Sequence, residues 1–203
     1  NLTQTLTYKK SFKKHDLTAL VGHEETNFEF NKMRIQGGGL FNSNVRLPAV
    51  ASTVAAANEA DHWALRGYLA RVFYSFDDKY LFTFNVRRDE TSRFSATNRS
   101  GVFPSLSFGW RITDEGFMKK QNLFSNLKLR ASWGESGNQF TGQNFAYLPS
   151  LATTIFYVIG AGQAIVRGPA PVVFANNNLK WERSAQTDIG LDATLLNGKI
   201  DVT

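Results

Sequence analysis

The strongest constraint on the fold of this chain is an alternation of apolar and polar side chains with a period of two residues. In the stretch YLFTFNVRRDETSRF, residues 80–94, the apolar side chains of Phe82, Phe84 and Val86 occupy alternate positions. The positions between them are polar or charged: Thr83, Asn85, Arg87 and Asp89. Successive side chains of a strand point to opposite faces of a sheet, so the pattern predicts a β-strand with one apolar and one polar face.

The same period recurs along the chain. It is present in VFPSLSFGWRI, LKLRASWG and RSAQTDIGLDATL, and in shorter form in the first 22 residues. In these segments the polar positions include Arg130, Asp188 and Asp192. Repeated strands with turn residues between them indicate an all-β antiparallel fold, and the chain offers about eight such strands.

Residues 63–76 allow two interpretations. Leu65, Leu69 and Phe73 have helical spacing, whereas Tyr68, Val72 and their neighbours at even positions would share one face of a strand. We favour the strand, because the following SFDDKY is a tight-turn sequence that leads directly into the strand at residue 80.

The connections between the expected strands fall into two groups. Three are short, with acidic or Asn-Gly residues typical of hairpins: residues 13–16, 77–79 and 197–199. A fourth, TDEGFMKKQNLFSN, has room for one helical turn begun by Asp114. Three others are expected to be long loops: residues 28–62, 89–101 and 138–181. If successive hairpins alternate between ends, short turns lie at one edge of the sheet and long loops at the other.

Alternation alone does not say which face meets water, because a soluble antiparallel sheet has the same pattern. The expected strands are about ten residues or longer, as a tilted membrane-spanning strand requires, and short turns opposite long loops are typical of outer-membrane barrels. Several aromatic residues near strand ends fit interfacial girdles: Tyr8, Tyr74, Tyr80, Trp110 and Trp133. We therefore favour a barrel with its apolar face toward lipid. A soluble β-sandwich or lectin-like domain remains the alternative.

In the barrel interpretation the polar face lines a wet lumen. Its charged members are Arg87, Asp89, Arg130, Asp188 and Asp192. The densest charged cluster comprises Arg87, Arg88, Asp89 and Arg93. We interpret this cluster as an ion-pair network that stiffens the wall, and its other possible role is to line a substrate path near the outer mouth.

Several classes of function find no support in the sequence. The chain has no cysteine, which excludes disulfides, thiolate metal sites and a cysteine nucleophile. His15, His23 and His62 lack metal-ligand spacing, and no nucleophile stands beside a positioned base. The net charge of +6 is scattered and not gathered on one face. We expect no enzyme activity, no metal or other cofactor, and no nucleic-acid partner.

The charge-free stretch FAYLPSLATTIFYVIGAGQAIV is long enough to span a bilayer as a helix. Polar residues, proline and glycine interrupt it and its surroundings, so we expect a long apolar loop. Its aromatic residues are candidates for contact with a substrate or with a partner that covers the mouth: Phe140, Phe145, Tyr147, Phe156 and Tyr157. Contact with a covering protein is the favoured role, because exposed apolar runs mark protein interfaces.

Four ordered blocks carry a resemblance to a known family: YSFDDKYLFTFNVRRDETSRF, NRSGVFPSLSFGWRITDEGFM, LKLRASWGESGNQ and NLKWERSAQTDIGLDATLLNGKIDV. Together they resemble the C-terminal half of a SusC/RagA-type TonB-dependent outer-membrane transporter. The resemblance extends over nearly all of residues 63–203. Glu90 and Gly116 depart from the family, which favours glycine and proline there, and both departures fall in expected connections.

The resemblance implies a single-chain barrel of about 22 strands with an internal plug. Residues 1–203 would be part of its C-terminal barrel domain, with the plug and the N-terminal segment outside this sequence. A SusD-like surface lipoprotein would cover the mouth, and an inner-membrane TonB–ExbB–ExbD complex would supply energy. The implied function is active import of an oligosaccharide or peptide across the bacterial outer membrane. The alternatives are a siderophore or cobalamin receptor of the same barrel type, a complete small structural or adhesive barrel, and a secreted glycan-binding β-domain.

Overall fold

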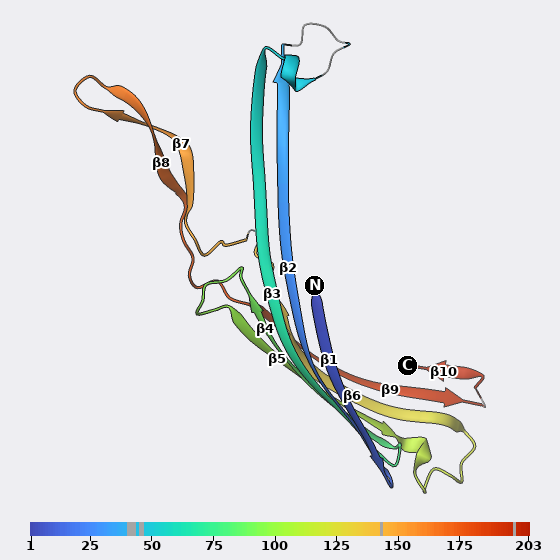
Figure 1. The fold of residues 1–203 in the computed structure, drawn as a ribbon. Coiled ribbons are helices and arrows are strands. Elements are labelled where there is room, and N and C mark those ends of the chain that lie inside the picture. Colours follow the sequence, from blue (N-terminus) through green and yellow to red (C-terminus); the bar gives the residue numbers. More distant parts are fainter. Residues whose placement is uncertain (40–43, 45–46, 143, 197) are drawn as a thin grey trace.

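The computed structural model describes residues 1–39, 44, 47–142, 144–196 and 198–203. Within that part the chain is all-β, apart from two single turns of 3-10 helix, η1 (Pro48–Val50) and η2 (Ile112–Asp114). Eight strands form one antiparallel sheet in the order β1-β2-β3-β4-β5-β6-β9-β10, and β7 pairs only with β8 (Figure 1). Their bounds are β1 Leu2–Phe12, β2 His15–Gly38, β3 Thr53–Phe76, β4 Tyr80–Thr91, β5 Ser100–Arg111, β6 Phe124–Asn138, β7 Ser150–Ile159, β8 Ala164–Val173, β9 Glu182–Leu195 and β10 Ile200–Val202.

The sheet is built almost entirely from hairpins between strands that follow one another in the sequence. The expected strand at residues 63–76 forms the lower part of β3, so the helical interpretation is wrong. The pairing of β6 with β9 is the exception, because the β7–β8 hairpin is inserted between them. The predicted all-β antiparallel fold is therefore confirmed.

The prediction of a loop over residues 28–62 is wrong for most of that segment. β2 and β3 stay paired from His15↔Phe76 to Gly38↔Thr53, well beyond the ends of β1 and β4. The result is a two-stranded ribbon that rises above the sheet, about 40 Å at the rise of an extended strand (Figure 1). A ribbon exposed on both faces needs no apolar face, and its sequence therefore has the polar character of a loop.

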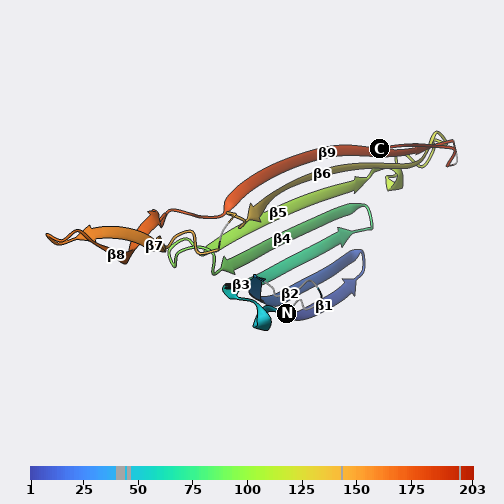
Figure 2. The ribbon, with the colours of Figure 1, turned by 90° about the horizontal axis from the view of Figure 1, so that it is seen from above.

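The other long connections are shorter or more ordered than expected. The segment between β4 and β5 is confined to residues 92–99, and the region before β9 contains the β7–β8 hairpin. That hairpin projects from the same edge of the sheet as the ribbon, opposite the short turns (Figures 1 and 2). The helical turn expected to begin at Asp114 is wrong in position, because the 3-10 turn η2 (Ile112–Asp114) ends at that residue. Asn197, in the predicted Asn-Gly turn, lies outside the described residues.

We also tested the alternative of a helix that crosses the bilayer through the charge-free stretch. Among the described residues, no helix has the length and apolar character needed to span a membrane. The stretch instead contains β7 and the beginning of β8.

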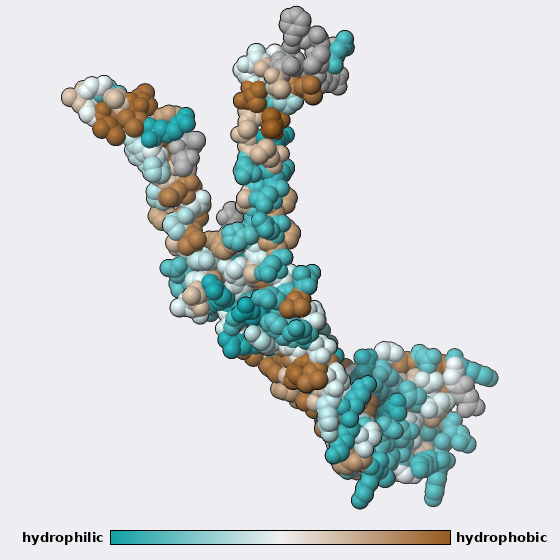
Figure 3. All heavy atoms as spheres, in the orientation of Figure 1, coloured by the Kyte–Doolittle hydropathy of each residue, from teal (hydrophilic) through white to brown (hydrophobic). Residues whose placement is uncertain are grey.

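The apolar face of the sheet carries ladders of aromatic rings that cross several strands. The ring of Phe82 lies 6.3 Å from that of Tyr74 and 5.0 Å from that of Phe108, and Tyr80 stacks on Trp110 at 6.3 Å. Figure 3 shows apolar residues gathered in a patch on the lower sheet, beside a mainly hydrophilic region toward β9 and β10. Trp133 belongs to the apolar positions too, but it lies within β6 and not at its end as expected.

A small buried core lies at the loop edge, on the other side of the sheet from these ladders. Phe94, Phe103 and Trp181 are almost fully buried there, and Leu65 and Leu179 pack against them. The indole Nε1 of Trp181 donates a hydrogen bond to the carbonyl of Arg99 at 3.0 Å. This core fixes residues 92–99 and the segment before β9 to the middle of β3 and the start of β5.

A charged network holds the turns at the opposite edge. Asp77 accepts hydrogen bonds from Lys14 and Lys79 at 3.0 and 3.2 Å, and these amines hold the pKa of Asp77 below its ordinary value. Glu115 accepts a 2.6 Å bond from the Tyr80 hydroxyl and a 3.1 Å bond from the Trp110 indole, which lower its pKa in the same way. Both carboxylates thus stay ionised at neutral pH and connect three turns.

Candidate functional site

The polar face of the sheet is the candidate functional surface. The structure places all five predicted lumen-facing charges on it: Arg87, Asp89, Arg130, Asp188 and Asp192. They do not form one cluster. Arg87 and Asp89 lie toward the loop edge on β4, whereas Arg130 and Asp192 lie toward the short turns on β6 and β9. The face therefore has two separate charged regions.

The first region is an arginine bridge that spans three strands. The Arg87 guanidinium binds Asp89 on its own strand at 2.7 Å and Glu24 on β2 at 2.7 Å. Between them on β3 lies Gly67, which pairs directly with both Glu24 and Asp89. A Cβ atom on Gly67 would stand 2.6 Å from both Arg87 Nη2 and Asp89 Oδ1. The missing side chain is what lets the guanidinium cross β3.

Gly67→Ala should therefore uncouple Arg87 from Glu24. In the wild type, Glu24→Gln should lower the free energy of unfolding by about 1 kcal/mol, because the half-exposed, charged hydrogen bond from Arg87 to Glu24 is lost. In the Gly67→Ala background the same substitution should cost close to nothing. A double-mutant cycle by urea unfolding of the full-length protein measures this coupling.

Gly116→Ala is the matched control, since no atom lies within 4 Å of the Cβ it would add. If Glu24→Gln costs the same in all three backgrounds, the bridge makes no energetic contribution.

The second region centres on Arg130, which uses the same device. Its Nε donates to Asp192 Oδ1 at 3.0 Å, and a Cβ on the intervening Gly190 would lie 3.0 Å from that nitrogen. A polar chain runs between the two regions: Arg71 Nε donates to Asn85 Oδ1 at 2.5 Å, and Asn85 Nδ2 donates to Ser105 Oγ at 3.0 Å. The face is thus a hydrogen-bonded surface with charged ends.

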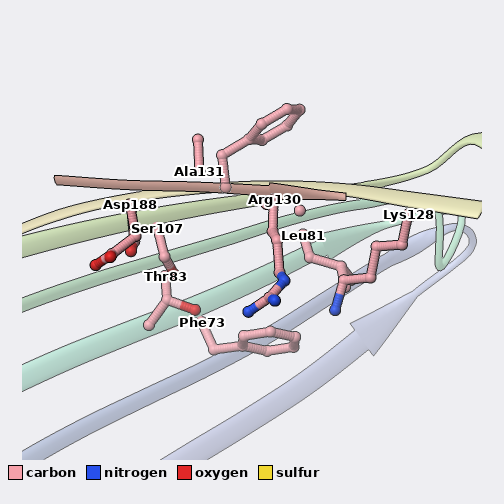
Figure 4. Close-up of a pocket in the computed structure, with 12 residues that line it drawn as sticks. Phe73, Leu81, Thr83, Ser107, Lys128, Arg130, Ala131 and Asp188 are labelled. Carbon is pink, nitrogen blue, oxygen red and sulfur yellow. The ribbon is translucent and has the colours of Figure 1, made fainter. Parts of the chain in front are cut away.

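A hollow of about 340 Å³ lies beside Arg130 on this face. Thr83, Ser107 and Asp188 line it together with Lys128, and the apolar side chains of Phe73 and Leu81 line it too. Figure 4 shows Lys128, Arg130, Thr83 and Asp188 on one side of the strands and Ala131 on the other. Hydroxyls, cations and one carboxylate in a single open hollow suit polar, hydrogen-bonding contacts.

The densest charged cluster of the sequence is divided by the strand. Arg88 points to the opposite face from Arg87 and binds Glu90 at 2.7 Å. Arg93 leaves the strand, and its guanidinium lies 4.5 Å from the Trp63 ring and 5.9 Å from the Phe140 ring. The expected single network is therefore three separate contacts, of which only the Arg87–Asp89 pair lies on the polar face.

The five aromatic residues predicted to contact substrate or a covering protein lie in two places. Phe140, Phe145 and Tyr147 lie near the base of the ribbon, where Phe145 contacts His62 at 4.9 Å between ring centroids. Phe156 and Tyr157 lie on β7 in the projecting hairpin, 60% and 42% exposed. Their roles stay predictions, and the structure does not bring the five together.

Reasoning from the sequence missed three groups that matter at this surface. Glu24 and Gly67 complete the arginine bridge, and Trp181 closes the core at the loop edge. Glu24 lies just beyond the first 22 residues, in which the alternation of apolar and polar side chains was recognised. Extending that alternation by two residues would have placed Glu24 on the polar face. Gly67 gave no sequence signal, because its role depends on which residues pair across it.

Comparisons with known proteins agree with this architecture. The profile of the family described as "TonB dependent receptor-like, beta-barrel" matches residues 1–203. TonB-dependent receptor SusC of Bacteroides thetaiotaomicron is 40% identical over 95% of this chain and 19% of its own length. TonB-dependent receptor P3 of Formosa agariphila is 34% identical over 98% of this chain and 20% of its own length.

Solved structures give the same picture. The RagAB peptide importer in its closed-closed and open-open states matches 98% of this chain and 22% of the compared chain, with TM-scores of 0.85 and 0.86 at 28% identity. The chain thus spans about a fifth of the length of the relatives it matches.

Proposed function

Because this chain belongs to the family of TonB-dependent receptor β-barrels, which are outer-membrane proteins, we propose that it is part of the wall of an active nutrient importer. The whole protein would import a bulky nutrient, an oligosaccharide or a peptide, across the bacterial outer membrane. The observation that carries this proposal is the match of the entire chain to the family and of its fold to a peptide importer. The family match also removes the secreted soluble β-domain as an alternative.

The two faces of the sheet support a division of labour. Lipid provides no hydrogen-bond partners, so the face with the aromatic ladders would meet the membrane and the face with Arg87 and Arg130 would line the lumen. The two-stranded ribbon and the β7–β8 hairpin would then project on the cell exterior. The polar face carries contacts for passage and wall stability, and we propose a transport role without catalysis.

The projecting hairpin supports a role for a covering partner. An isolated two-stranded hairpin is marginally stable in water, and β7–β8 exposes large apolar side chains such as Phe156 and Ile165 on it. We propose that a SusD-like surface lipoprotein covers this region. It would also contact Phe140, Phe145 and Tyr147 near the base of the ribbon. Energy would come from a TonB–ExbB–ExbD complex through a part of the protein outside residues 1–203.

Uptake by cells tests this function. Cells that lack the full-length gene should lose uptake of labelled oligosaccharides or peptides, and cells that lack TonB should show the same loss. The lipoprotein should co-purify with the receptor in detergent. Loss of siderophore or cobalamin uptake in place of these nutrients would instead assign the protein to the other branch of the barrel class.

A further inference from the structure

The hollow beside Arg130 has an unusual distribution of charge. Lys128 pairs directly with Asp192 across the β6–β9 ladder, yet the Asp192 carboxylate binds Arg130. Asp188, the acid that lines the hollow, accepts a hydrogen bond from Gln186 at 3.2 Å. Within the described part of the chain, Lys128 therefore has no ion-pair partner, although Asp192 lies directly across the ladder from it.

Two glycines hold the cations in place over the sheet. A Cβ on Gly109 would lie 3.2 Å from Lys128 Cε, and one on Gly190 would lie 3.0 Å from Arg130 Nε. The stem of Lys128 and the guanidinium of Arg130 thus lie against bare backbone. Figure 4 shows their charged ends on the same side of the sheet. Hydroxyls of Thr83, Ser107 and Ser132 line the same hollow and offer further hydrogen bonds to an anionic group.

The charged region at the other end of the face has polar partners for its cations. There Arg87 binds two carboxylates, and the neighbouring Arg71 donates a hydrogen bond to Asn85. The hollow also contains apolar surface on the polar face: Phe73 is 36% exposed and lines it together with Leu81. An aromatic ring left open to a wet lumen is unfavourable, and a polypeptide segment packed there would bury it.

We propose that Lys128 binds a carboxylate on a segment of this same chain that fills the barrel lumen. The proposal rests on the proposed function, since only a large barrel has a lumen that a plug fills. Residues 1–203 span about a fifth of the relatives' length, and a whole protein of their length would supply such a segment. A lysine ammonium is a compact charge on a flexible stem and suits such a contact, and Phe73 and Leu81 would pack against the same segment.

A carbodiimide cross-link tests the proposal directly. The reagent activates a carboxyl group, and the Lys128 amine displaces the urea leaving group to form an amide only where the two groups touch. The full-length protein in purified outer membranes, without added nutrient, should give a cross-linked peptide that joins Lys128 to an acidic residue outside residues 1–203. Lys128→Arg should abolish that peptide, and Lys119→Arg, in the exposed β5–β6 connection, should leave it intact.

Three outcomes would overturn the proposal: a cross-link from Lys128 only to Asp188 or Asp192, no modification at Lys128, or a product that forms only when a nutrient acid is added. As a second measurement, Lys128→Ala should raise the entry of a bulky antibiotic through the barrel about tenfold, since the lumen-filling segment loses one charged hydrogen bond to the wall. Unchanged entry of the antibiotic would argue against a contact between Lys128 and that segment.

The cross-link is measured without transport, so it separates the two proposals. A wild-type protein that forms the cross-link but imports no nutrient would contradict the proposed import function. The same result would support the contact between Lys128 and the lumen-filling segment.

Discussion

Replacing Ile189 by arginine should strongly destabilise the full-length receptor in a lipid bilayer. Ile189 lies within β9 opposite Ala131, on the apolar face, and is 79% exposed. If that face meets lipid, arginine there has to enter hydrocarbon, which costs about 2–4 kcal/mol near the bilayer midplane. The free energy of unfolding from lipid vesicles, measured by urea titration, should fall by that amount.

Gln186→Arg provides the matched control on the same strand. Gln186 lies on the polar face and already donates to Asp188, so an arginine there keeps an acidic neighbour. Its effect should stay within about 0.5 kcal/mol, as for other surface substitutions. Equal effects of the two substitutions, or a larger effect of Gln186→Arg, would mean that the assignment of the faces is wrong.

The sequence was sufficient to predict the faces of the sheet because a strand has a strict period of two. The alternating apolar positions of residues 82–86 and 102–110 lie on the face of the aromatic ladders, whereas Ile112 belongs to η2. The five predicted charges lie on the opposite face. Period-two patterning requires no knowledge of partners. At residues 63–76 the pattern allowed both a helix and a strand, and the tight turn that follows decided correctly for the strand.

The same reasoning failed where the backbone leaves the sheet. The upper parts of β2 and β3 pair only with each other, so neither face needs to be apolar and the alternation fades. Polar residues and a glycine run then indicated a loop. The β7–β8 hairpin was missed for the opposite reason, since apolar residues on both of its faces hide the period.

The contacts of the site required the register, which the sequence does not show. Arg87 and Asp89 could be chosen as a pair on one strand, but Glu24 lies two strands away and 63 positions earlier in the chain. The two meet only because Gly67 lies between them. In the same way, the partner of Arg130 is Asp192, which is paired in the ladder with Lys128 and not with Arg130. A one-residue change of register would remove both contacts.

Trp181→Ala should open the loop edge of the sheet while leaving most of the sheet intact. Trp181 is 8% exposed, and its ring makes edge contacts with Phe94 and Phe103 at 5.8 and 5.3 Å between centroids. Truncating a buried tryptophan costs about 3–5 kcal/mol. The Arg99 carbonyl, which also accepts the Thr91 amide at 3.1 Å, would lose the indole hydrogen bond. The amide hydrogens of residues 92–99 should therefore exchange with solvent at least about 100 times faster than in the wild type. A cost of about 3–5 kcal/mol corresponds to a factor of that order.

Trp133→Ala is the control for this substitution, because it removes the same side chain from the apolar face. Trp133 lies on β6, 41% exposed, and does not belong to the buried core. Its loss should leave hydrogen exchange at residues 92–99 unchanged, which mass spectrometry of the full-length receptor can measure. If both variants speed exchange equally, the loop is held by the barrel as a whole. If only Trp181→Ala does so, one indole from the segment before β9 orders the β4–β5 loop, so the shape of this part of the mouth depends on a contact between residues 82 positions apart.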